Sequence, residues 1–189
     1  MPETLLLGLT SYIGTNLDDL LLNVLFFSEA QTPSRRRSII AGKYCGIFVL
    51  VLLSVLAAGG LQLLPHRYLS LLGLLPIGLG LRALFTANTE NEPAPSHQGR
   101  SLWLEVALTT AANGADNLGV YIPLFAGFSP WQLLTVFCVY AAMTALWCWG
   151  SIKLTALPPL QRLLQRHRRI VIPVVYLAIG GYILLKGWL

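Results

Sequence analysis

The sequence has little charge for its length. Of its 189 residues only 11% are charged, with 8 Asp or Glu against 13 Lys or Arg. Charged residues make up about 25% of a typical globular protein, so this chain has too little charge to cover a water-soluble surface. In contrast, 55% of its residues are hydrophobic, and they occur in long runs. The composition indicates an integral membrane protein.

Several familiar motifs are also missing. The three cysteines, Cys45, Cys138 and Cys148, show neither CxxC nor Cys/His spacing, so we expect neither a disulfide framework nor a zinc site. The sequence has no GxxxxGK[ST] loop that would bind a nucleotide. No Lys or Arg precedes the first apolar run, which leads into Tyr12, Asn16 and two aspartates. We therefore expect no cleaved signal peptide.

Six apolar stretches are long enough to cross the ~30 Å hydrocarbon core of a bilayer as helices. They are bounded by charge, Pro or Gly, and they cover residues 4–28, 38–61, 68–87, 102–127, 131–154 and 170–188. The longest connection, 88–101, is polar and contains proline, which predicts a flexible cytoplasmic linker. We expect an all-α membrane protein with one three-helix half in 1–87 and a second in 102–189.

Positive charge is concentrated in two connections. The first contributes Arg35, Arg36 and Arg37, with Lys43 nearby, and the fifth contributes Arg162, Arg166, Arg168 and Arg169. The positive-inside rule places both in the cytoplasm, so the alternation of loops places the N- and C-termini outside. We interpret the basic residues as a topology signal that also attracts anionic lipid head groups, and not as a nucleic-acid site.

The two halves carry related motifs. Laying "TNLDDL" over "NGADNL" pairs Asp18 with Asp116 and Asp19 with Asn117, and each half also has a proline followed by glycines in its third helix, "LPIGLG" and "IPVVYLAIGG". With three helices each, homologous halves run through the membrane in opposite directions. The pattern predicts a 3+3 inverted repeat with a substrate site near the bilayer midplane, on helices interrupted at Gly14, Gly114 or Pro123.

Polar residues form a stripe on the first and on the fourth expected helix. At spacings of three and four, the stripes contain Tyr12, Asn16, Asp19 and Asn23, and Glu105, Thr109, Asn113 and Asp116. We expect the stripes to face each other and not lipid. One alternative is that these side chains only join helices through hydrogen bonds.

Three aspartates lie in these segments: Asp18, Asp19 and Asp116. An aspartate at a helix centre disfavours insertion by ~2.5 to 3.5 kcal/mol. With no basic residue in the central part of either helix, the three carboxylates would repel one another unless protonated or bound to a cation. Carboxylate, amide and hydroxyl oxygens favour a hard or borderline divalent ion. Cys45 or Cys138, near Tyr44 and Tyr140, would add a softer ligand, unless both are small packing residues in helix interfaces.

The strings "TNLDD", "GKYCG", "LLGLLPIGLG" and "ANGADNLGVYIPLF" together resemble the CadD-type cadmium resistance transporters, within the LysE superfamily of exporters. The resemblance covers nearly the whole chain. It implies efflux of cadmium, or of another divalent metal such as zinc or manganese, from a bacterial cytoplasm across the inner membrane. Carried over by motif, the metal ligands are Asn16, Asp18, Asp19, Asn113, Asp116 and Asn117. The accessory candidates are Thr15, Tyr44, Cys45, Glu105 and Thr109.

Energetics predict the type of transport. Moving a dication outward against an inside-negative potential costs ~4.6 kcal/mol per 100 mV. Without a nucleotide site, export needs a coupling ion or a steep outward gradient of the metal. We expect a metal/proton antiporter in which Asp18, Asp19 and Asp116 take either metal or protons, with sodium as the alternative coupling ion. Glu105 would guide cations from the cytoplasm, unless it is a solvated or lipid-head-level residue.

The prediction for the protein is a transporter and not an enzyme, with no cofactor besides the transported ion. Its rivals are an exporter of basic amino acids and a membrane thiol oxidoreductase. The sequence leaves the oligomeric state open, a homodimer included.

Overall fold

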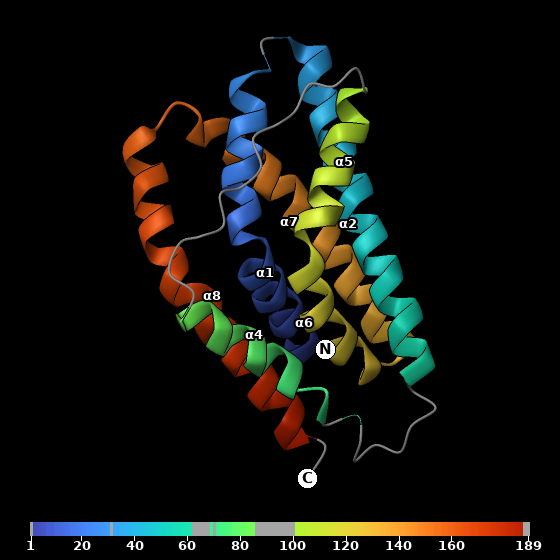
Figure 1. Ribbon diagram of the computed structural model, residues 1–189. Helices are drawn as coiled ribbons and strands as arrows, with labels where there is room; N and C mark the ends of the chain where they lie inside the picture. Colours follow the sequence, from blue (N-terminus) through green and yellow to red (C-terminus); the bar gives the residue numbers. More distant parts are fainter. Residues whose placement is uncertain (1, 31, 62–68, 70, 86–100, 187–189) are drawn as a thin grey trace.

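The computed structural model describes residues 2–30, 32–61, 69, 71–85 and 101–186, and they are almost entirely helical (Figure 1). The main helices are α1 (Pro2–Ser28), α2 (Pro33–Leu61), α4 (Leu74–Phe85), α5 (Leu102–Asn113), α6 (Ala115–Ala126), α7 (Pro130–Leu154) and α8 (Pro158–Lys186). No strand occurs in these described ranges, so the expected all-α class is confirmed. The expected linker 88–101 lies outside them except for Ser101.

Two helices are long and apolar enough to cross a membrane. They are α2, with a mean hydropathy of 2.3, and α7, with 1.7. At 1.5 Å per residue they are about 43 and 37 Å long, more than the ~30 Å of a hydrocarbon core. The 12-residue α4 reaches only about 18 Å, and residues 170–185 of α8 are also a shorter apolar segment. The expected third span, 68–87, is therefore only partly seen as a helix, and its ends lie outside the described residues.

The basic connections are more helical than expected. α2 begins at Pro33 and so includes Arg35, Arg36 and Arg37 in its first turns. α8 begins at Pro158, so the expected loop before residue 170 is helix for most of its length. Proline is favoured in the first turn of a helix, where its missing N–H costs no hydrogen bond. Both helices thus begin earlier than hydrophobicity alone predicts.

The fourth expected helix, 102–127, is broken at Gly114 into α5 and α6. Gly114 has a φ of −85° and a ψ of 19°, a conformation open to most residues. The need for glycine comes from packing instead, because a Cβ atom there would overlap the side chain of Leu50 on α2. The predicted interruption at Gly114 is confirmed. Those at Gly14 and Pro123 are wrong, since both residues lie inside continuous helices.

Helices of the two halves are interleaved. α1 packs along α7 and α8, α2 packs along α5 and α6, and α4 lies across the second half of α8. Figure 1 shows α1 in the middle of the bundle, with the start of α1 and the end of α8 at the same end. The first helix of each half therefore packs against the second helix of the other half.

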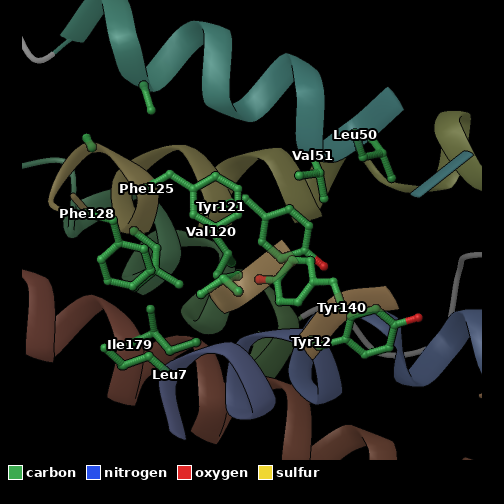
Figure 2. Close-up of a cluster of buried hydrophobic side chains, with 14 of the residues drawn as sticks. Leu7, Tyr12, Leu50, Val51, Val120, Tyr121, Phe125, Phe128, Tyr140 and Ile179 are labelled. Carbon is green, nitrogen blue, oxygen red and sulfur yellow. The ribbon is translucent and has the colours of Figure 1, made fainter. Parts of the chain in front are cut away.

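Tyrosine rings fill the centre of the bundle (Figure 2). Tyr12 comes from α1, Tyr121 from α6 and Tyr140 from α7, and all three are buried. The ring centroids of Tyr121 and Tyr140 are 4.9 Å apart, and those of Tyr12 and Tyr140 are 5.3 Å apart. Aromatic rings at this distance pack favourably while their hydroxyls need polar partners. The core therefore places phenolic oxygens beside the two polar motifs.

Candidate metal centre

The polar stripe of α1 faces the protein interior. Tyr12, Asn16, Asp19 and Asn23 are all buried. Because α1 is one uninterrupted helix, the spacing of three and four residues keeps these side chains on a single face. The prediction that this stripe avoids lipid is confirmed.

Asn16 is fully buried and held by several contacts. Its Nδ2 lies 2.9 Å from the hydroxyl of Tyr121, 2.9 Å from Thr15 Oγ1 and 3.1 Å from the carbonyl of Tyr12. The indole N–H of Trp147 donates to the main-chain oxygen of Asn16 over 2.7 Å. With its nitrogen committed in this way, Oδ1 finds no donor within the part of the chain that the structure describes. A buried acceptor left without a partner costs about 1–3 kcal/mol, and a cation would relieve that cost.

Asp116 and Asn117 begin α6. Asp116 Oδ1 accepts the backbone N–H of Asn117 over 3.0 Å, and Oδ2 accepts the hydroxyl of Tyr176 on α8 over 2.7 Å. The N-terminal end of a helix favours a carboxylate. Asn117 is 3% exposed, and its Oδ1 has no hydrogen-bond donor among the described residues. Each motif therefore contributes one buried amide oxygen without a donor.

Tyr176 links the two motifs. It donates its hydrogen bond to Asp116 and also lies within electrostatic range of Asp18. Asp18 is half-buried on α1. The hydrogen bond thus joins α6 to α8, with the Asp18 carboxylate of α1 within electrostatic range of the same phenol.

Asp19 has a different environment. Its Oδ2 forms an ion pair with Nζ of Lys43, whose side chain is 0% exposed. Neither motif helix carries a basic residue in its central part, but the neighbouring α2 supplies one. Lys43, which lies near the basic residues of the first connection in the sequence and within the expected span 38–61, is well inside α2.

The three aspartates do not form a single cluster. The described residues contain no group of three or more His, Cys, Asp and Glu side chains placed to hold a metal ion. Asp18 and Asp19 are neighbours on a helix and therefore point about 100° apart, and Asp19 is paired with Lys43. Asp19 therefore has an ion-pair partner on α2, and the other candidate oxygens are the carboxylates of Asp18 and Asp116 and the amide oxygens of Asn16 and Asn117.

A profile of the cadmium resistance transporter family matches residues 12–187. The chain belongs to the cadmium resistance transporter family. The match includes both polar motifs, Lys43 and all helices from the middle of α1 onward. No curated protein and no solved structure matches the chain. Membership, together with the apolar helices α2 and α7, identifies a membrane transporter related to cadmium resistance.

The second stripe is not continuous in this family member. Glu105 is buried and Thr109 is half-buried, but Asn113 is exposed. The break at Gly114 changes the helical phase, so Asn117 faces inward where Asn113 does not. Asn113 therefore does not join the buried group, and Glu105 is not the solvated residue of the alternative interpretation.

The accessory residues of the transporter lie in different places. Thr15 Oγ1 lies 2.8 Å from the hydroxyl of Tyr121 and so supports the site. The hydroxyl of Tyr44 donates to the carbonyl of Ala141 on α7 over 2.9 Å. Cys45 is half-buried, and like Cys138 and Cys148 it is a free thiol. Tyr44 therefore joins two helices outside the polar group.

Three residues of the centre were missed by sequence reasoning. Tyr121 follows Asn117 by four positions, so its place on the same helical face was readable from the motif. Lys43 lies within "GKYCG" and was counted with the charges of the loop. Tyr176 has no local signal, because its role depends on how α8 packs against α1 and α6.

Proposed function

We propose that the protein exports divalent metal ions, with cadmium as the main substrate, across the bacterial inner membrane by secondary active transport. The observation that carries the proposal is a pair of buried amide oxygens, on Asn16 and Asn117, that find no donor among the residues the structure describes. One comes from each motif. With Asp18 and Asp116 they make a ligand set of oxygens, which suits divalent cations. Asn113 is left out of this set because it is exposed.

Binding would replace a hydrogen bond by a metal contact. In the structure the hydroxyl of Tyr176 donates a hydrogen bond to Oδ2 of Asp116. A cation that takes this oxygen displaces the phenol, which belongs to α8. The arrangement couples occupancy of the site to the packing of α8 against α6.

The interleaving of the halves supports an inverted repeat. In a 3+3 repeat a twofold axis relates the first span to the fourth and the second span to the fifth. Contacts between the first and fifth spans are then equivalent to contacts between the second and fourth spans. The packing of α1 on α7 and of α2 on α5 and α6 has this form. Inverted repeats place their substrate between the halves and expose it to one side of the membrane at a time. We propose this alternation for the export step.

Proton antiport would supply the driving force. Export of a dication against the potential costs ~4.6 kcal/mol per 100 mV. Protons entering from the outside would occupy the carboxylates when the site opens outward. They would help release the metal and return to the cytoplasm with the empty carrier.

Uptake into inside-out vesicles tests the proposal. With an imposed proton gradient we expect accumulation of cadmium, and loss of that accumulation in Asp116→Asn, because the central carboxylate charge is gone. Glu29→Gln is the matched control, since it removes an exposed carboxylate outside the site and should transport as the parent does. Equal uptake by Asp116→Asn and the parent would show that Asp116 is not a ligand.

A further inference from the structure

The amide of Asn16 is turned in one direction by its own helix. The carbonyl oxygen of Tyr12 lies 3.1 Å from Nδ2 of Asn16. A carbonyl can only accept a hydrogen bond, so the nitrogen of the amide, and not its oxygen, must face it. Oδ1 takes the other side of the amide, where it finds no donor among the residues that the structure describes. The orientation of this side chain therefore decides whether an oxygen or an N–H group is offered to a cation.

A hydrogen-bond relay of two hydroxyls continues from Asn16. Nδ2 donates to the hydroxyl of Tyr121 over 2.9 Å, and that hydroxyl lies 2.8 Å from Oγ1 of Thr15. Thr15 donates its own hydroxyl proton to the carbonyl oxygen of Ser11, 2.9 Å away. Because each hydroxyl has a single proton, Thr15 must accept from Tyr121, whose oxygen is left to accept from Asn16. The direction of every hydrogen bond in the relay is therefore fixed.

Tyr121 also belongs to the motif that supplies Asn117. It follows Asn117 by four residues on α6 and so lies on the same helical face. Tyr121 is fully buried, and its hydrogen bond ties the Asn16 amide of α1 to α6. We propose that Tyr121 is a positioning residue, oriented by Thr15, that keeps Oδ1 of Asn16 aimed at the metal. This inference rests on the proposed function and gives Thr15 a positioning role in place of the expected role as an accessory ligand.

Loss of either hydroxyl of the relay weakens this orientation. In Tyr121→Phe the amide nitrogen of Asn16 keeps only acceptors of its own helix. In Thr15→Val the proton of Tyr121 loses its acceptor and is free to turn toward Asn16, where it attracts the amide oxygen and favours the flipped side chain. A flipped amide presents N–H donors to a cation, and these repel it.

Cadmium binding to the purified protein, measured by calorimetry, tests the relay. For Tyr121→Phe and for Thr15→Val we expect the dissociation constant to rise about tenfold, since the hydrogen-bond partner of a metal ligand is worth about 10–100-fold. Thr15→Ser restores the acceptor and should rescue binding. Tyr44→Phe is the matched control, because it removes an interhelical hydrogen bond of the same 2.9 Å length outside the polar group. It should bind as the parent does.

A double variant separates positioning from packing. If Tyr121 acts through Asn16, then Tyr121→Phe should cost no further affinity in an Asn16→Ala background. An equal loss in both backgrounds would mean that the phenol only supports the fold, and parent-like binding by Tyr121→Phe would also overturn the inference. Should Tyr121→Phe not fold, the comparison of Thr15→Val with Thr15→Ser decides alone, and equal affinities of these two would refute the relay.

The outcome for the proposed function is read separately in vesicles. If the parent transports cadmium but cadmium binding ignores Tyr121 and Thr15, only this inference fails. If the parent transports no divalent ion, the proposed function fails, and the role of Tyr121 fails with it.

Discussion

At the scale of single residues, the candidate site depends on which buried amide oxygens find no hydrogen-bond donor among the described residues. Asn16 commits its amide nitrogen to Tyr121, Thr15 and its own helix, which fixes the direction of its oxygen. Asn117 also has a buried oxygen with no donor in the described portion of the chain. Asn113 is one helical turn earlier and exposed. The two asparagines of one motif therefore have opposite environments.

This contrast gives a matched pair of variants. Asn117→Ala removes a proposed ligand, so cadmium transport should fall by about tenfold or more, since even outer partners of metal ligands are worth about 10–100-fold. Asn113→Ala changes the same side chain at an exposed position and should transport as the parent does. Transport rates in vesicles, normalised to protein content, make the comparison. The reverse ranking would favour Asn113 as the ligand.

At the scale of helices, small residues set how closely α2 approaches its neighbours. Gly42 and Gly46 face α5, and Gly114 at the start of α6 meets Leu50 of α2. Close packing through small residues is a usual way to join helices in a bilayer. Here it also holds Lys43 beside α1 and positions the first turn of α6 with Asp116. The contact of α2 with α5 and α6 thus supports the geometry of the site.

Substituting glycine within α2 tests that support. Gly46→Ala places a Cβ within 2.6 Å of Thr110 Cβ, and overpacking of this kind costs about 1–3 kcal/mol, so thermal unfolding in detergent should occur at a lower temperature. Gly59→Ala meets no atom within 4 Å among the described residues. As a helical Gly→Ala change it should be neutral or stabilising by up to about 1 kcal/mol. Equal loss of stability at both positions would mean that the α2–α5 contact is looser than described.

At the scale of the whole molecule, the chain has two distinct ends. Figure 1 shows the α1–α2 connection at one end and the α6–α7 connection at the other. Arg35, Arg36 and Arg37 are exposed at the first end, at the start of α2. From the positive-inside rule we propose that this end faces the cytoplasm. We then expect the α6–α7 connection and both chain termini to face outward.

Accessibility of introduced cysteines tests the orientation. In a background with the native cysteines replaced by serine, Ser34→Cys and Gly127→Cys place one thiol at each end, at positions that are exposed. An impermeant maleimide added to intact spheroplasts should label Gly127→Cys, and should label Ser34→Cys only after lysis. Labelling in the opposite order would overturn the assigned orientation.

The sequence by itself determined the membrane environment of the protein, its helical class and its two polar motifs. Low charge and long apolar runs leave a bilayer as the only suitable environment, and periodicity places Tyr12, Asn16, Asp19 and Asn23 on one buried face. It also identified Gly114 as a point of interruption. These features are local, since they depend on composition, on spacing along one helix and on backbone chemistry.

Tertiary structure decided which polar groups meet. The pairs Lys43–Asp19 and Tyr176–Asp116 each join residues on different helices. The spacing of polar residues along one helix does not tell how the neighbouring helix is rotated about its own axis. A change of helical phase also occurs at Gly114, where Leu50 of α2 leaves no room for a Cβ atom. It turns Asn117 inward and leaves Asn113 outside, because a helix break resets which residues share a face.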